Sequence, residues 1–230
     1  MRPLMLALSL CLAVALGAQG KAATLTPTDL ALAYARAMPY KQFLAADTTR
    51  AADWSAAAAR TAASVAEVVG TTPPPAGRWR LLVVADNSCS DALASLPYLA
   101  QLAEQSPMGE LRILRKADAD KLVAAHPFNG RSATPLVFVL DSAFRERGVW
   151  TERASHIQAF VVANEGKMND DSLWARVRVM RRDDNGRTPL REVIALMRSA
   201  QPADVTPSKP SKGKANAKSQ PKLLAPCRVP

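Results

Sequence analysis

Apolar residues in the first third of the chain recur at the three- and four-residue spacing of amphipathic helices. The spacing predicts two helical segments, the first capped by Thr26 or Thr28 and the second over 51–69. The apolar positions of the first segment are Leu30, Ala33, Tyr34 and Met38. Three prolines and a glycine in 71–77 then end regular structure. The pattern therefore predicts a helical lead-in over 23–77 that finishes in a proline-rich linker.

From residue 78 the pattern changes to short apolar runs rich in strand-forming residues, which indicates buried strands. These runs are 79–85, 111–115, 136–140 and, after a turn at Asp141, 145–150. The predicted helices between and after them are 91–105, 118–125, 153–164, 171–182 and 189–199. The order of elements predicts an α/β fold, in which a mixed sheet is flanked by helices on both faces.

The amino terminus has the composition of a secretory signal peptide. One positive charge at Arg2 precedes a nearly uninterrupted apolar run from Leu4 to Leu16, and small residues follow. We expect residues 1–22 to be a signal peptide, cleaved after Gly20 or Ala22. The run is too short to span a bilayer comfortably, and a retained membrane anchor is the alternative. The alanine and arginine richness is typical of bacteria, so we expect an exported protein in the periplasm, with secretion as the alternative.

The carboxyl-terminal residues 201–230 hold much of the positive charge of the chain. The formal net charge is +10, and the tail carries six basic residues against Asp204 alone. Its proline, serine, lysine and alanine content predicts a basic disordered tail, which suits contact with anionic surfaces. The remainder of the chain is only mildly basic, so we expect no specific nucleic-acid partner.

The mature chain would contain two cysteines, Cys89 and Cys227, because Cys11 falls inside the signal peptide. Two cysteines allow one disulfide, which is not a multiple-disulfide framework. We therefore expect the hydrophobic core to stabilise the fold without disulfides. His126 and His156 stand alone, with no cysteine or carboxylate at ligand spacing. We therefore expect no metal and no cofactor.

Cys89 lies where a buried strand gives way to a helix. It follows the turn residues 86–88 and precedes the predicted helix 91–105. Unpaired backbone N–H groups at a helix amino terminus stabilise an anion, and the thiolate is the reactive form of cysteine. Asp86 and Asp91 oppose this effect, because nearby negative charge disfavours ionisation. Cys89 is therefore the candidate nucleophile, and the balance of charge around it stays open.

Thr134 and Pro135 stand directly before the third predicted strand, 136–140. Proline is tolerated at the first position of a strand but not in its middle. A cis bond between Thr134 and Pro135 would leave backbone groups available to an extended thiol or peptide substrate. Most X–Pro bonds in folded proteins are trans, so the residues alone favour an ordinary strand start. Both alternatives stay open at this point.

Residues 78–165 resemble the thioredoxin-like superfamily. The resemblance rests on the strand 79–85, the loop Asn87-Ser88-Cys89-Ser90-Asp91-Ala92, the following helix and strand, and Thr134-Pro135 before a hairpin. Exported bacterial thioredoxin family proteins with a helical lead-in are similar. The resemblance implies a thioredoxin-like domain over 78–200, Cys89 as the attacking cysteine and Pro135 as a cis-proline facing it. It also implies a partner protein or peptide that carries a thiol or disulfide.

The loop departs from the family pattern, which typically reads Trp-Cys-x-x-Cys. Ser88 replaces the usual tryptophan, and Ala92 stands where the resolving cysteine belongs. A dithiol enzyme uses that second thiol to release its mixed disulfide. Three hypotheses follow: monothiol exchange resolved by an external thiol, pairing of Cys89 with Cys227 as the resolving thiol, or a non-catalytic module that binds a peptide or an envelope component.

Overall fold

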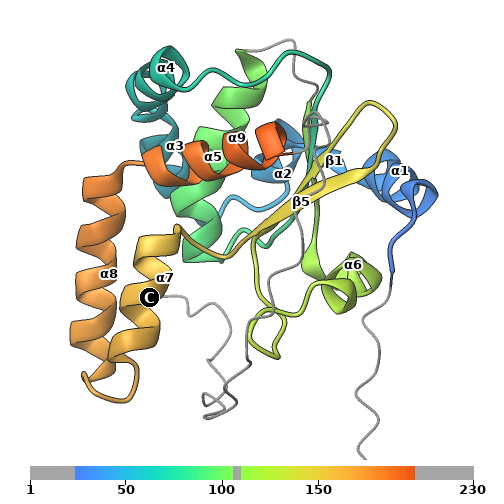
Figure 1. The fold of residues 1–230 in the computed structure, drawn as a ribbon. Helices are drawn as coiled ribbons and strands as arrows, with labels where there is room; N and C mark the ends of the chain where they lie inside the picture. The colour runs from blue at the N-terminus through green and yellow to red at the C-terminus, as the bar shows by residue number, and fades with distance from the viewer. Residues whose placement is uncertain (1–23, 106–109, 200–230) are drawn as a thin grey trace, which may run out of the picture.

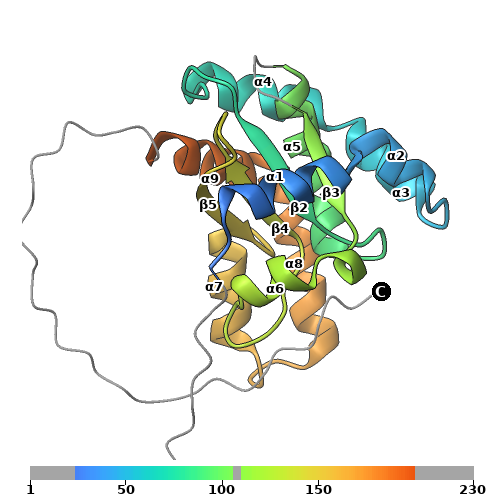
Figure 2. The ribbon, with the colours of Figure 1, turned by 90° about the vertical axis from the view of Figure 1, so that its right-hand side faces the viewer.

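The computed structural model describes residues 24–105 and 110–199, and within them the chain forms one mixed sheet with helices on both faces (Figures 1 and 2). The spatial order of the strands is β1-β3-β2-β4-β5. Their bounds are β1 Met38–Pro39, β2 Arg80–Val84, β3 Leu111–Leu114, β4 Leu136–Leu140 and β5 Glu146–Thr151. The predicted α/β, thioredoxin-like mixed sheet with a helical lead-in is confirmed. The predicted signal peptide and basic tail lie outside the described residues.

The sheet is parallel on one side of β2 and antiparallel on the other. Leu82 of β2 is paired with Arg112 of β3 in the parallel ladder and with Phe138 of β4 in the antiparallel one. β4 and β5 form an antiparallel hairpin. All residues of β4 are buried, and so are all residues of β2 except Arg80, which explains why both strands read as continuous apolar runs.

Helices cover both faces of this sheet. Their bounds are α1 Pro27–Arg36, α2 Tyr40–Ala45, α3 Ala51–Ala58, α4 Thr61–Thr71, α5 Ser90–Glu104, α6 Asp120–Ala125, α7 Ser155–Asn164, α8 Asp170–Asp184 and α9 Arg187–Ser199, with a 3₁₀ turn η1 at Lys116–Asp118. Figure 2 shows α1 and α6 on one face. Figure 1 shows α7 and α8 side by side, projecting beyond the end of the sheet. No helix of the described part is long and apolar enough to cross a membrane.

The alternation of side chains along the strands divides the interior into two cores. On one face Leu81 and Val83 pack with residues of α3, α4, α5 and α9, including Trp54 and Leu99. On the other face a second set packs with Leu30 of α1 and with α6. The sheet residues of this second core are Leu82, Val84, Leu136, Phe138 and Leu140. The lead-in helices therefore complete both cores.

The lead-in follows the sequence pattern at its start and departs from it at Met38. Thr26 caps α1, its hydroxyl accepting from the backbone N–H of Asp29 at 3.2 Å, as one of the two predicted caps requires. Met38 was expected to continue this helix, but it pairs with Ile113 as part of β1. The cause is Pro39, because a residue before proline is driven from the helical region into an extended conformation.

The second predicted helix, 51–69, is two helices in the structure. α3 ends at Ala58, and α4 begins at Thr61. The hydroxyl of Thr61 donates to the carbonyl oxygen of Ala58 at 2.8 Å, which satisfies one of the open carbonyl groups at the end of α3. The break lets α3 and α4 each pack on α5.

Candidate functional site

Cys89 is the residue that caps the amino terminus of α5. Its backbone is extended, with φ −74° and ψ 118°, and its carbonyl accepts from the N–H of Leu93 at 3.0 Å, which starts the helix. The N–H of Cys89 donates to the carbonyl of Asp86 at 3.1 Å, so the loop between β2 and α5 is a tight turn. The residue is 1% exposed. The structure therefore places Cys89 between strand and helix, where the sequence pattern put it.

Cys89 and Thr134, which lie far apart in the sequence, meet at the end of the sheet. The sulfur atom of Cys89 is 3.5 Å from the carbonyl oxygen of Thr134 and 4.0 Å from its hydroxyl oxygen. The Thr134–Pro135 bond is cis, which decides between the two alternatives that the sequence left open. These three residues form one site. Cys227, the predicted resolving thiol, lies outside the described residues, and its role stays a prediction.

The cysteine loop is fastened to the helical lead-in by two side chains. Nη1 of Arg50 donates to the carbonyl oxygen of Ser88 at 3.1 Å. The amide nitrogen of Asn87 donates to the carbonyl oxygens of Phe43 and Asp47 at 3.1 and 3.3 Å. The lead-in thereby fixes the residues immediately before Cys89. Sequence reasoning missed Arg50, because nothing local to it marks a partner in a distant loop.

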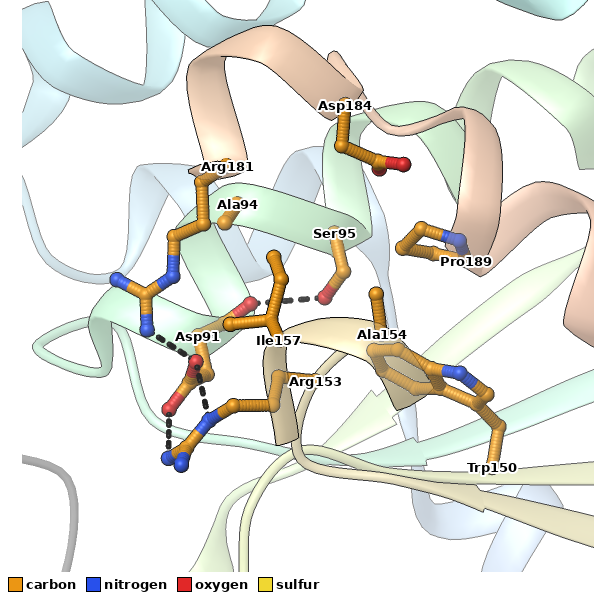
Figure 3. Close-up of a pocket in the computed structure, with 10 residues that line it drawn as sticks. All are labelled: Asp91, Ala94, Ser95, Trp150, Arg153, Ala154, Ile157, Arg181, Asp184 and Pro189. Atoms are coloured by element: carbon orange, nitrogen blue, oxygen red, sulfur yellow. Dashed lines mark hydrogen bonds and ion pairs between the residues drawn. The ribbon is translucent and has the colours of Figure 1, made fainter. Parts of the chain in front are cut away.

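A buried ion network begins at Asp91, two residues after Cys89. The carboxylate of Asp91 accepts from Nε and Nη2 of Arg153 at 3.2 and 2.8 Å, and it also pairs with Nη2 of Arg181. Figure 3 shows the two guanidinium groups converging on this carboxylate from opposite sides. Only 4% of the Asp91 side chain and 5% of the Arg153 side chain are exposed. The carboxylate of Asp91, which the sequence suggested would oppose ionisation of Cys89, is therefore held between two cations.

Glu152 extends the network to the cis-proline. Its carboxylate accepts from Nη2 of Arg131 at 2.6 and 2.7 Å and lies 2.8 Å from Nη2 of Arg153. Its backbone N–H donates to the carbonyl of Pro135 at 2.8 Å. Burial disfavours the charged form of Arg153, but Asp91 and Glu152 outweigh it, so the pKa of Arg153 is raised. The network thus connects the start of α5 with the proline loop.

Position 92, where the family has its resolving cysteine, is a fully buried alanine on α5. Cys89 is the sole cysteine among the described residues and is disulfide-bonded in this structure, and no group of three or more histidine, cysteine or acidic residues there is arranged to hold a metal ion. A small cavity beside Asp91, of about 20 Å³, is lined by Trp150, Ile157 and Arg181 (Figure 3). Its volume suits about one water molecule, so it is not a substrate cleft.

Comparison with known proteins agrees with this geometry. Residues 37–171, more than half of the chain, match a family model described as thioredoxin. The chain therefore belongs to the thioredoxin family, as the resemblance of its cysteine loop and proline loop implied. No curated protein matches the sequence.

Two solved structures share the fold. One is a protein of unknown function, PA1234, from Pseudomonas aeruginosa, with 22% identity and a TM-score of 0.56 over 74% of this chain and 97% of that one. The other is an HIV epitope scaffold, with 20% identity and a TM-score of 0.51 over 73% of this chain and 96% of that one. At these identities the likeness shows the fold alone.

Proposed function

We propose that this chain is a thiol–disulfide exchange protein of the cell envelope that reacts through Cys89. The observation that carries the proposal is the meeting of three features: the sulfur of Cys89, the amino terminus of α5 and the backbone of cis-linked Thr134 and Pro135. A helix amino terminus favours the thiolate, and the backbone beside the cis-proline suits pairing with an extended peptide.

The reaction proceeds in two exchanges. The thiolate of Cys89 attacks one sulfur of the partner's disulfide, a mixed disulfide forms, and the partner's other sulfur leaves as a thiolate. A second thiolate then attacks the sulfur of Cys89 and releases the partner as a dithiol. The partner's disulfide is reduced, and Cys89 and the second thiol are oxidised to a disulfide. Ala92 cannot supply that second thiol, so it comes from an external thiol or from Cys227.

A non-catalytic binding module is the second candidate function. The cysteine loop favours it, because Ala92 stands where a dithiol enzyme has its resolving cysteine. In this case the backbone of Thr134 and Pro135 would hold an extended peptide or an envelope component without chemistry at the sulfur.

Alkylation of the reduced full chain separates the two functions. Iodoacetamide labelling of Cys89 is followed by mass spectrometry of its peptide between about pH 5 and pH 10, with free cysteine as the reference. Exchange chemistry predicts labelling that is faster than that of free cysteine at neutral pH and follows a lowered pKa. Labelling no faster than that of free cysteine, together with unchanged partner capture by Cys89→Ser, would leave the binding module as the function.

The source of the second thiol is tested separately. Non-reducing peptide mapping of oxidised full-length protein identifies Cys227 as the resolving thiol if a linkage between Cys89 and Cys227 is found. Its absence assigns the step to an external thiol. Export to the periplasm is supported by the signal-like residues 1–22. Cell fractionation tests it, with secretion into the medium as the alternative outcome and a membrane-bound, uncleaved chain as the contradicting one.

A further inference from the structure

We infer that Arg153 and Arg181 are positioning residues that cancel the charge of Asp91 beside Cys89. The inference rests on the proposed function, because it concerns the ionisation of the same sulfur. The sequence left open whether the acidic residues of the loop outweigh the effect of the helix amino terminus on the ionisation of Cys89. The ion pairs of Asp91 bear directly on that balance.

The position of Asp91 makes a counter-charge necessary. It lies in the first turn of α5, two residues after Cys89, and its side chain is 4% exposed. A buried carboxylate so close to a thiolate is weakly screened by solvent and opposes ionisation of the sulfur. Arg153, from the junction of β5 and α7, and Arg181, from α8, both pair with this carboxylate. Its field at the sulfur is therefore opposed by two cations.

The charges of the network balance one another. Three arginines, Arg131, Arg153 and Arg181, share two carboxylates, Asp91 and Glu152, through ion pairs, and the charge of Glu165 also acts on Arg153, so the sum of formal charges is 3 − 3 = 0. Two of these arginines, Arg131 and Arg153, are more than nine-tenths buried, and each retains a buried guanidinium nitrogen without a hydrogen-bond partner. The carboxylate of Asp91 therefore has its counter-charges within the network, and in the reduced protein it does not oppose ionisation of the Cys89 sulfur as an uncompensated anion.

The other charges around the cysteine loop do not upset this balance. From the lead-in, Arg50 donates to the carbonyl of Ser88, next to Cys89, and its own partner Asp53 is more than half exposed. From the loop itself, the carboxylate of Asp86 accepts the backbone N–H of Lys116 at 3.3 Å. The strand side presents the neutral groups of Thr134.

The test measures the pKa of Cys89 from iodoacetamide labelling rates of the reduced full chain. Arg181→Gln is expected to raise this pKa by about half a unit to one unit, which lowers the labelling rate at neutral pH about three- to tenfold. Arg181→Lys keeps the charge and should stay close to the wild type. The matched control is Arg182→Gln, because Arg182 is the next residue on α8, is 74% exposed and pairs only weakly with exposed Asp183.

A second variant is expected to shift the pKa of Cys89 in the opposite direction. Asp91→Asn leaves Arg153 and Arg181 uncompensated, so it should lower the pKa of Cys89, and the double variant Asp91→Asn with Arg181→Gln should return it toward the wild type. Circular dichroism verifies that each variant is folded, and Asp91→Asn still tests the sign if Arg181→Gln does not fold. Coincident profiles for Arg181→Gln and Arg182→Gln, or a raised pKa in Asp91→Asn, would overturn the inference. An unreactive wild-type Cys89 would instead overturn the proposed function.

Discussion

The hydroxyl of Tyr98 donates a hydrogen bond to Oδ1 of Asn185 at 2.7 Å, and this contact fixes the end of α8 against the middle of α5. Asn185 adopts the left-handed conformation that ends α8, with φ 47°, and its amide nitrogen donates to the hydroxyl of Ser64 on α4. Three helices are thereby joined at one residue, immediately before Gly186.

Substitution of Gly186 by alanine is expected to destabilise the protein by about 2–4 kcal/mol, because the added methyl group would overlap the ring of Tyr98 and Gly186 has φ +73°. Gly166 is the matched control, since it has the same φ of +73° but open space around the position of a Cβ. Gly166→Ala should lower the free energy of unfolding by only about 1 kcal/mol. Urea denaturation measures both, and equal losses would show that the contact with Tyr98 contributes nothing.

Replacement of Arg153 by methionine should destabilise the fold strongly. The change removes one cation from two buried carboxylates, Asp91 and Glu152, and the expected loss is about 3 kcal/mol. Arg182→Met changes an exposed arginine and should stay within about 0.5 kcal/mol of the wild type. Chemical denaturation of the two variants tests the claim, which a similar midpoint for both would contradict.

Asp141 should make stability depend on pH in the acidic range. Burial raises its pKa, but hydrogen bonds from the backbone and side chain of Arg145 and from Arg147 outweigh this and lower the pKa to about 2. Because the folded-state pKa lies below the ordinary value of 3.8, the stabilisation is complete above about pH 4 and is lost as the pH falls toward 2.

The expected contribution of Asp141 at neutral pH is about 1–2 kcal/mol. Asp141→Asn should therefore be less stable than the wild type at pH 7, with a difference that narrows as the pH falls from 4 to 2. Thermal melts across this range measure the difference. A gap between the two proteins that is constant with pH would show that the charge of Asp141 is not responsible.

Arg50→Ala should loosen the cysteine loop. It removes a charged hydrogen bond to the carbonyl of Ser88, for an expected loss of about 1–3 kcal/mol. Hydrogen exchange in residues 86–89 should accelerate more than exchange in β4. Arg60→Ala is the control, because Arg60 is exposed and lies on the same lead-in. Equal exchange in the loop for both variants would mean that Arg50 does not hold it.

Most of the strands and the position of Cys89 were predictable because their signals are local. The run 136–140 is apolar at every position, which is typical of a strand buried on both faces, and β4 has these bounds. The position of Cys89 follows from a strand, turn residues and a helix that are contiguous in the sequence. Met38 was assigned wrongly because the helical spacing includes it, whereas the steric effect of Pro39 decides its conformation.

The ion network was not predictable, because its members have no common pattern. Arg131, Arg153 and Arg181 come from a loop, a strand end and a late helix, and each stands among ordinary polar residues. Only the closing of β5 against the proline loop and the packing of α8 near α5 bring them together. The sequence identified Asp91 as a charge that opposes ionisation of Cys89. The arginines that pair with it, Arg153 and Arg181, lie 62 and 90 residues further along the chain.

The two-residue strand β1 also bears on whether this edge of the sheet can pair with a strand of another molecule. It forms one outer edge of the sheet, and Pro39, paired with Arg112 of β3, has no N–H group to offer to a further strand. An edge that is this short and lacks a donor is a poor template for strand addition, which is a common start of aggregation. The proline that interrupted the expected helix thus also makes this edge less able to add a further strand.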